Sequence, residues 1–157
     1  VIPQPISRYI KTLYSRLNGR ICGPGWHSGR FAFKKGVFQG DPLSPIVFLM
    51  CFNPIVEYLE SVRQQYGYDF AGQRIITTPY ADDFNLITGN KRQHQKIVNE
   101  IDEKLKTMGL MLKPRKCRSL SISSGKPTVV NFSVANEQID SVHDNPIKFL
   151  GSHITFP

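Results

Sequence analysis

Two adjacent carboxylates are the residues of this chain best suited to chemistry. Asp82 and Asp83 follow Tyr80 and Ala81, and β-branched or apolar runs lie on both sides. Two runs of strand length joined by a short link predict a β-hairpin with the carboxylates at its tip. Like charges this close repel one another, and a divalent cation would offset the repulsion. Oxygen ligands without Cys or His nearby favour a hard ion such as Mg²⁺, although an isolated Asp pair also occurs in solvated acidic turns.

A glycine-containing loop at residues 36–45 is the second candidate. Gly36 and Gly40 carry no side chain, so a ligand or a strand backbone can approach them closely. Gln39 offers both a hydrogen-bond donor and an acceptor. A plain glycine turn before a helix is the simpler interpretation of this loop taken alone.

The residues after the loop predict a long helix. Ser44 followed by Pro45 is typical of a helix start, with a capping hydroxyl and then proline in the first turn. Residues 46–52 are apolar on every face, which predicts a buried helix. Pro54 predicts a kink or a restart.

The remaining periodicities predict an α+β fold. Apolar residues recur at helical spacing over 6–17 and again from about Lys91 to Gly109. Residues 30–34 alternate with the period of a strand, residues 22–29 resemble a loop, and four short strands are expected beyond Arg118. We therefore expect helices packed on one face of a small antiparallel sheet.

Composition points to a polyanionic partner. The 157 residues suit one domain or part of one, and the net charge is +8. The first 40 residues contain seven Lys or Arg and no acidic residue, which suits binding to phosphate backbones. Ordinary solvated side chains remain the alternative for each candidate phosphate contact, namely Arg8, Lys11, Arg30, Lys34 and Lys35.

The other residue types exclude several classes. Three widely spaced cysteines without a CxxC pattern predict reduced, core or semi-buried thiols of an intracellular protein, not disulfides or a zinc site. The wholly apolar run at 46–52 falls short of the roughly 20 residues of a membrane helix, so we expect no membrane partner. We expect a nuclear and/or cytoplasmic location. The chain lacks an initial Met and ends in mid-pattern, which predicts a fragment.

Four motifs together resemble the palm of a reverse transcriptase, particularly of the non-LTR retrotransposon type. Residues 38–45 (FQGDPLSP) resemble the family's substrate- and template-contacting loop and helix, and residues 80–83 (YADD) resemble its catalytic hairpin. Residues 109–117 (GLMLKPRKC) are similar to the segment after the next helix, and residues 149–151 (FLG) to the hairpin that holds the primer end. The whole chain, 1–157, is thus expected to be a partial reverse transcriptase domain. The YADD motif alone is a weak pattern, but four motifs in the family's order are a strong one.

The resemblance implies nucleotidyl transfer from deoxynucleoside triphosphates to a DNA primer on an RNA template. Two Mg²⁺ ions roughly 4 Å apart, or Mn²⁺ in their place, would serve the reaction. It implies Asp82 as the direct metal ligand and Asp83 as an auxiliary carboxylate. Tyr80 would pack near the primer terminus, with a strand-core role as the alternative. Gln39 and Gly40 would border the nucleotide and the template base. The primer would be supported by Phe149, Leu150 and Gly151. Lys116 would contact pyrophosphate or another phosphate.

One departure from the family limits these expectations. A further catalytic Asp belongs on a strand before the FQGDPLSP segment, yet no acidic residue precedes Asp41. The fingers and the full thumb, which would be partners from the rest of the polymerase chain, are also absent. We therefore expect the chain by itself to be inactive. The alternatives are a decayed or domesticated nucleic-acid-binding remnant, an intron-encoded reverse transcriptase, and the palm of an RNA-dependent RNA polymerase.

Overall fold

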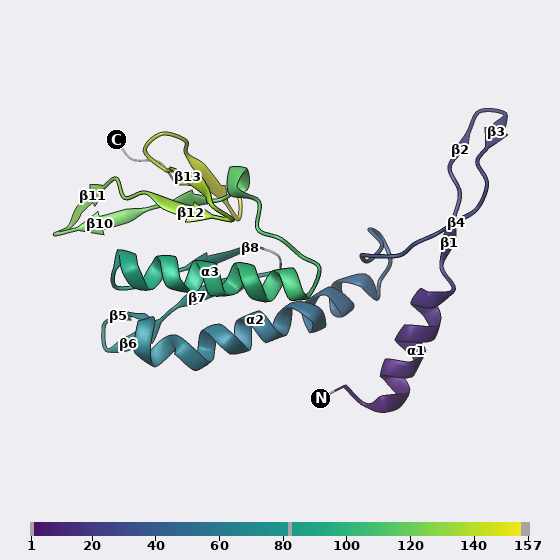
Figure 1. Ribbon diagram of the computed structural model, residues 1–157, viewed down its shortest axis with the longest axis horizontal. Helices are drawn as coiled ribbons and strands as arrows, with labels where there is room; N and C mark the ends of the chain where they lie inside the picture. Colours follow the sequence, from purple (N-terminus) through teal and green to yellow (C-terminus); the bar gives the residue numbers. More distant parts are fainter. Residues whose placement is uncertain (1, 82, 155–157) are drawn as a thin grey trace. The chain divides into compact units, whose positions relative to one another are not determined.

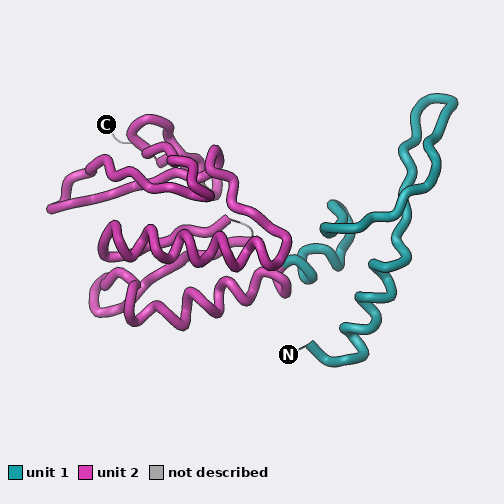
Figure 2. The backbone as a smooth tube through the Cα atoms, viewed as in Figure 1, with its two compact units in different colours: residues 1–48 teal, residues 49–157 magenta. Residues whose placement is uncertain are grey.

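The computed structural model describes residues 2–81 and 83–154, with the backbone alone at Phe149. Helices and short strands alternate along this part of the chain (Figure 1), which confirms the predicted α+β class. Contacts within the chain separate it into two compact units, residues 1–48 and residues 49–157 (Figure 2).

Unit 1 consists of a helix, a two-stranded ribbon and a loop. The helix α1 covers Gln4–Ser15, which confirms the helix predicted over 6–17. In the ribbon, β1 (Asn18–Gly19) pairs with β4 (Phe31–Ala32), and β2 (Cys22–Gly23) pairs with β3 (Trp26–His27). The loop predicted at 22–29 is therefore wrong, because a hairpin occupies it. The strand predicted over 30–34 is reduced to the two residues of β4.

Unit 1 has no hydrophobic core within residues 2–48. No apolar side chain in that range is buried, and the one buried residue is Ser44. Aromatic contacts hold the ribbon and the loop together, with ring centroids 5.3 Å apart for Phe31–Phe33 and 4.5 Å apart for Phe33–Phe38. Part of the apolar side of α1 remains in water, since Ile6 is 48% exposed, whereas Ile10 and Leu13 are half-buried.

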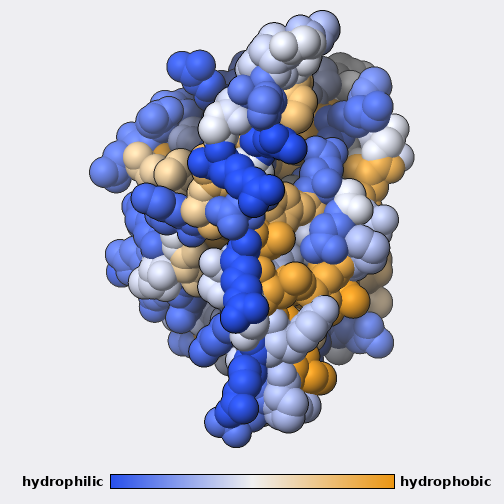
Figure 3. Space-filling model, turned by 90° about the vertical axis from the view of Figure 1, so that its right-hand side faces the viewer, coloured by the Kyte–Doolittle hydropathy of each residue, from blue (hydrophilic) through white to orange (hydrophobic). Residues whose placement is uncertain are grey.

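The helix α2 (Ser44–Tyr66) begins in unit 1 and continues into unit 2. Its start at Ser44 confirms the predicted helix start, and it runs unbroken through Pro54, so the predicted restart is wrong. The predicted burial of 46–52 is also wrong for most of that run. Phe52 is buried, whereas Leu49 is 51% exposed, because only the later part of the helix packs into a core, through Ile55 and Leu59. Figure 3 shows hydrophobic side chains reaching the surface beside hydrophilic ones.

The length of α2 changes one expectation. By length and composition it could cross a membrane, with 23 residues and a mean hydropathy of 1.3 over its most apolar 18-residue window. The expectation from residues 46–52 is that the apolar segment is too short to cross a membrane. That expectation is wrong for α2 as a whole. A core helix of a globular protein meets the same criterion, so this observation does not assign a membrane.

Unit 2 places the rest of α2 and the helix α3 (Lys91–Thr107) among short hairpins (Figure 1). The expected single antiparallel sheet is wrong in form. The described strands make several two-stranded hairpins and a three-stranded sheet, in which β13 pairs with β12 antiparallel and with β9 parallel. These strands are β5 (Tyr68–Phe70), β6 (Gln73–Ile75), β7 (Thr77–Tyr80), β8 (Asp83–Leu86), β9 (Arg118–Ser119), β10 (Ser121–Ser123), β11 (Lys126–Thr128), β12 (Phe132–Val134), β13 (Glu137–Ser141), β14 (Ile147–Phe149) and β15 (Ser152–Ile154).

The helix α3 supplies four of the twelve buried hydrophobic side chains described for unit 2, more than any other element. Asn90 caps its start, since the side chain accepts a hydrogen bond from the Gln93 amide at 3.0 Å. Ile97, Ile101 and Leu105 recur every four residues and are all buried, so the predicted amphipathic helix is confirmed. The neighbouring Val98 packs into a buried cluster with Phe132, Val134 and Ile139 of the three-stranded sheet.

Side chains also join α3 to the sheet by hydrogen bonds. The Gln95 amide donates to the Ser133 carbonyl at 2.8 Å and accepts from the Ser133 amide at 2.9 Å. It thereby satisfies backbone groups of β12 as another strand would. This pairing was not predicted, because a Gln on a helix has no sequence pattern that marks it as a partner of a strand.

The cysteines are free, as predicted, but two of them are not in a core. Cys22 and Cys51 are exposed, and Cys117 is half-buried. Burial raises the pKa of the Cys117 thiol, whereas the nearby Arg118 opposes that shift.

His94 is a half-buried imidazole at the junction of α3 and the sheet. Its ring centroid lies 4.6 Å from that of Phe132, and its Nδ1 is 3.2 Å from the Thr88 hydroxyl. Burial lowers the pKa of His94 from 6.5 to about 4. The folded state therefore excludes a proton that the unfolded chain binds between these pH values.

We predict that the free energy of unfolding of unit 2 falls as pH falls from 6.5 to 4, by roughly 3 kcal/mol from this group. The substitution His94→Gln should remove this share of the pH dependence, as measured by urea unfolding at several pH values. The substitution His153→Gln, at an exposed histidine, is the matched control and is measured over the same pH series. Equal pH profiles for wild type and His94→Gln would contradict the prediction.

Candidate functional site

The hairpin that bears the two carboxylates forms as predicted. Strands β7 and β8 pair antiparallel from Thr77 with Leu86 to Tyr80 with Asp83, which leaves Ala81 and Asp82 between the last paired residues. Ala81 has a φ of 54°, in the left-handed region that costs a non-glycine residue of the order of 1 kcal/mol. The first strand of this hairpin starts at Thr77, because Ile75 pairs with Tyr68 in the preceding hairpin.

The core of unit 2 holds this hairpin from its base. Ile76 is almost completely buried, and its carbonyl accepts a hydrogen bond of 2.8 Å from the Ile87 amide. The ring of Phe84 lies 5.8 Å from that of Phe52 on α2. Because its base is buried, the hairpin can hold the side chains at its exposed tip in fixed positions.

Side chains at the tip are open to solvent. Tyr80 is 64% exposed, so the alternative of a strand-core role for it is wrong. Asp83, its pairing partner, is exposed and forms no ion pair with any described residue. Asp82, the predicted direct metal ligand, lies outside the described residues.

The donors at the tip fit a hard divalent cation in type. A free carboxylate beside a second one in the sequence supplies oxygen ligands, as Mg²⁺ and Mn²⁺ prefer. Within residues 2–81 and 83–154, no three His, Cys, Asp or Glu side chains come together as a metal cluster. The described part of the tip thus contributes one carboxylate, that of Asp83.

The loop at 36–45 lies in unit 1, and its glycines are required by backbone conformation. Gly36 and Gly40 have φ values of 89° and 90°, and a Cβ added at either would meet nothing within 4 Å. Residues with a side chain rarely adopt this backbone conformation. A substitution at either glycine would therefore strain the backbone, although there is space for the new side chain. Gln39, between them, is exposed.

Asp41 is the hydrogen-bonding centre of this loop, a role that sequence reasoning missed. One carboxylate oxygen accepts from the Leu43 amide at 3.2 Å, and the other accepts from the Ser44 hydroxyl at 3.0 Å. The Tyr14 hydroxyl of α1 also donates to Asp41, at 3.4 Å. The Ser44 hydroxyl therefore serves as a donor to Asp41 and not in the helix-capping role predicted for it. An Asp three residues before the Ser-Pro helix start was the available signal in the sequence.

The predicted site residues Leu150, Gly151 and Lys116 are exposed on separate elements of unit 2. Leu150 and Gly151 form the two-residue turn between β14 and β15, and Leu150 is 54% exposed. The backbone of Phe149 ends β14, whereas its side chain lies outside the described part of the chain. Lys116 ends the 3-10 helix Pro114–Lys116, and its side chain is exposed.

The predicted phosphate contacts are all in unit 1 and all exposed, and none forms an ion pair with a described residue. Asp41 is the one acidic residue of unit 1, and it is already engaged. These cations are Arg8, Lys11, Arg30, Lys34 and Lys35. Their charge is therefore available to an external anion.

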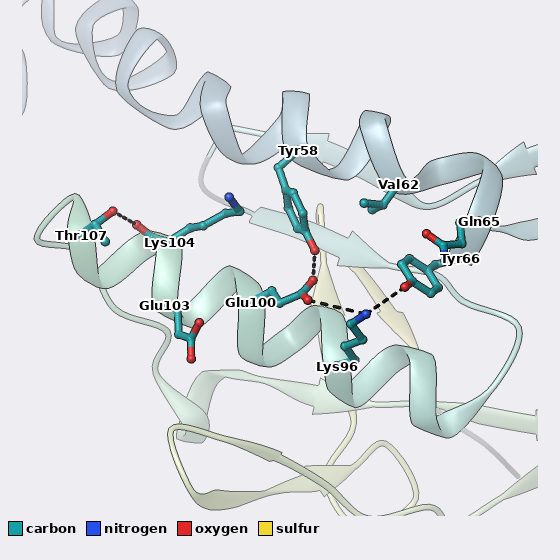
Figure 4. Close-up of a pocket in the computed structure, with 9 residues that line it drawn as sticks. All are labelled: Tyr58, Val62, Gln65, Tyr66, Lys96, Glu100, Glu103, Lys104 and Thr107. Atoms are coloured by element: carbon teal, nitrogen blue, oxygen red, sulfur yellow. Dashed lines mark hydrogen bonds and ion pairs between the residues drawn. The ribbon is translucent and has the colours of Figure 1, made fainter.

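A groove of about 540 Å³ between α2 and α3 contains none of the predicted site residues (Figure 4). Its polar groups pair with one another. The Tyr58 hydroxyl donates to Glu100, and the Lys96 ammonium donates to the Tyr66 hydroxyl at 3.0 Å. Burial and Glu100 raise the pKa of Tyr58, while the bond with Tyr66 raises that of Lys96. These contacts join the two helices.

Comparison with known proteins identifies the class to which this hairpin and loop belong. The family model described as reverse transcriptase (RNA-dependent DNA polymerase) matches residues 1–154. The chain therefore belongs to the reverse transcriptase family.

The similar curated proteins are Pol polyproteins of R2 retrotransposable elements. Identity is 30% with the type-1 R2 protein of Nasonia vitripennis, over 96% of this chain, and 29% with the type-2 R2DM protein of Drosophila melanogaster, over 98%. An R2 protein of Popillia japonica is 27% identical over 81% of the chain. These relatives confirm the resemblance to the non-LTR retrotransposon type. The chain spans 15% of the length of the first two.

We predict that Asp41→Ala loosens the first turn of α2, because the substitution removes the acceptor of the Leu43 amide and of the Ser44 hydroxyl. Loss of such a cap costs about 1 kcal/mol, or about fivefold in local opening. Hydrogen exchange of the Val47 amide, which bonds to the Leu43 carbonyl at 3.0 Å, measures this opening.

A matched control is Asp144→Ala, since Asp144 is exposed and its side chain bonds to no described residue. That substitution should leave Val47 exchange unchanged. Unchanged exchange in Asp41→Ala would show that the Asp41 bonds do not hold the start of the helix.

Proposed function

We propose that this chain is the palm portion of an RNA-directed DNA polymerase and that its hairpin tip is part of the polymerase centre. The observation that carries the proposal is the hairpin itself, whose base is buried and whose tip presents Asp83 and Tyr80 to solvent. Family membership supports the reaction class, and the R2 relatives favour it over an RNA-dependent RNA polymerase.

In the proposed reaction, the 3′-hydroxyl of a DNA primer attacks the α-phosphorus of a deoxynucleoside triphosphate. A new P–O bond forms, the bond to the leaving pyrophosphate breaks, and the hydroxyl proton passes to solvent, while the RNA template selects the base. Two bound Mg²⁺ ions, or Mn²⁺, supply activation of the hydroxyl and neutralisation of charge on the leaving group. Asp82 would hold the ions directly and Asp83 would assist.

Other residues take supporting roles in this proposal. The exposed Tyr80 ring would lie against the primer terminus, and Gln39 with Gly40 would border the nucleotide and the template base. The turn at residues 149–151 would support the primer backbone, and Lys116 would contact a phosphate. The exposed cations of unit 1 would bind the nucleic-acid backbone. A nuclear and/or cytoplasmic location belongs to the same proposal.

The alternative is a non-enzymatic remnant. No acidic residue precedes Asp41, and Asp41 is engaged in hydrogen bonds that hold a helix start. The third carboxylate expected from the family is thus absent from residues 1–157. A remnant would bind nucleic acid through its cations and show no metal-dependent activity in any longer product of the same gene.

We predict that Mn²⁺ binds at the hairpin tip. In the ¹⁵N-labelled chain, paramagnetic Mn²⁺ should broaden the amide signals of Ala81 and Phe84 at concentrations that leave those of β10 and β11 sharp. Asp82→Asn and Asp83→Asn should each weaken the effect about tenfold or more, because each removes an anionic oxygen donor. The control Asp69→Asn alters another hairpin carboxylate, which is paired with Arg74, and should change nothing. Equal broadening in all four proteins would refute the site.

We also predict that the 157-residue chain does not incorporate labelled deoxynucleotides on a primed RNA template, because two carboxylates give weaker metal binding than three. A longer product of the same gene that contains an Asp-bearing strand before residue 1 should extend the primer and should lose this activity on Asp82→Asn. Incorporation by the 157-residue chain, abolished by Asp82→Asn, would contradict the first statement. Inactivity of the longer product would favour the remnant.

A further inference from the structure

The ribbon of unit 1, residues 18–32, has a surface that the polymerase centre does not use. We call it the arm. Beyond the β1–β4 pair, the Ser28 amide donates to the Ile21 carbonyl at 2.8 Å, and the Ile21 amide donates to the Ser28 hydroxyl at 2.9 Å. Hydrogen bonds therefore continue along the ribbon to the β2–β3 tip, which in Figure 1 is the end of the arm farther from α1. A ribbon bonded along its length holds its side chains in fixed register.

The register of the arm changes at its two arginines. Gly19 pairs with Phe31, whereas Cys22 pairs with His27, so the second strand has one more residue than the first between these pairs. This is the geometry of a β-bulge. The extra residue lies between Ser28 and Phe31, opposite Arg20. Arg20 and Arg30 therefore occupy the same level of the ribbon.

Trp26, near the tip of the arm, is unusually exposed for its residue type. It is 57% exposed, although burial of a tryptophan side chain is strongly favourable. Its indole ring lies across Gly23, its pairing partner, since a Cβ added to Gly23 would be 2.4 Å from the indole Nε1. Glycine thus allows the ring to rest on the backbone, while the remaining ring surface faces solvent.

The charge of the arm is uncompensated. Arg20 and Arg30 are exposed, and neither forms an ion pair with a described residue. The arm contains no acidic residue. At about 3.3 Å per residue, Arg20 lies roughly 10 Å along the strand from Gly23, and the alternation of side chains directs it to the ribbon face opposite the indole that rests on Gly23. A flexible single strand can reach both faces by crossing the edge of a two-stranded ribbon. Cations and an aromatic face at this separation match a polyanion that also offers flat rings.

We propose that the arm binds a single-stranded segment of nucleic acid, with Trp26 stacked on an unpaired base and Arg20 and Arg30 in contact with phosphates. The inference rests on the proposed function, in that it gives one surface on which an RNA or DNA strand would lie. Single strands are favoured over a duplex because the bases of a duplex are already stacked on one another. The two arginines carry the charge contacts, and the indole adds attraction that does not depend on salt.

The chain offers a direct measurement, because Trp26 is its sole tryptophan. Titration with a 12-nucleotide RNA or DNA single strand at 50 mM salt should quench the Trp26 fluorescence, and a matching duplex should quench it far less. Binding of either strand supports the inference, and the tighter one names the preferred nucleic acid. Absence of quenching, or equal quenching by the duplex, would overturn it.

Variants separate stacking from charge. With a labelled strand followed by anisotropy, Trp26→Ala should weaken binding about tenfold, and Trp26→Phe should recover most of that loss. Arg20→Gln with Arg30→Gln should weaken binding and reduce the slope of log K against log salt by about 1.4 for two lost phosphate contacts. Unaltered binding in Trp26→Ala would overturn the stacking role.

The hairpin of β10 and β11 supplies matched controls, because it also presents an exposed cation, Lys126, and an exposed apolar side chain, Ile122. Lys126→Gln and Ile122→Ala should leave binding unchanged. A loss of affinity equal to that of the arm variants would show that the arm contributes nothing specific to binding.

A blue shift of Trp26 emission with anionic vesicles that no oligonucleotide reverses would instead assign the arm to a membrane. The two proposals can fail separately. If Mn²⁺ broadens the signals of Ala81 and Phe84 but no nucleic-acid strand binds to the arm, the proposal for the arm is refuted and the proposal for the polymerase centre is not.

Discussion

The burial of one side of α3 in the core is the interaction on which unit 2 depends. The strands of this unit are two to five residues long, and isolated hairpins of that size are marginal in water. Ile97, Ile101 and Leu105 are fully or almost fully buried, and each contributes about 1.5–3 kcal/mol relative to exposure. The Gln95 bonds to Ser133 add orientation to this burial. The carboxylate hairpin is positioned because Leu86 of its strand β8 packs against the buried cluster that contains Val98 and Phe132.

Unit 1 is stabilised by a different kind of contact. It buries no apolar side chain within residues 2–48, so its order comes from the Asp41 bonds, the aromatic rings and the hydrogen bonds of the arm. Each such contact contributes less to the free energy of folding than a buried aliphatic side chain does. The polar hydrogen bonds mainly fix the orientation of the groups that they join. The exposed apolar side chains of α1 and of the first half of α2 are surface that water disfavours and that covering would stabilise.

Charge is divided between the units in a way that suits the proposed function. Seven of the 20 Lys and Arg residues but one of the 12 acidic residues lie in residues 1–48, whereas both hairpin carboxylates lie in unit 2. A cationic unit attracts a phosphate backbone over distances near the Debye length, about 8 Å in physiological salt. An acidic tip repels the same backbone unless a cation is bound there, which makes metal binding and substrate binding mutually favourable in the proposed centre.

The sequence by itself determined the features that depend on local pattern. The helices α1 and α3, the start of α2 at Ser44 and the Asp82–Asp83 hairpin follow from periodicity and turn chemistry, and four short motifs sufficed to indicate the family. Other features depend on which surfaces of the folded chain come into contact, and the tertiary structure alone decided these. It left Leu49 in water on a wholly apolar run, engaged Asp41 with Tyr14 of another helix, paired Gln95 with a strand, and laid Trp26 across Gly23. Those outcomes depend on contacts between residues distant in the sequence or across a hairpin, and the local pattern of either partner contains no record of the other.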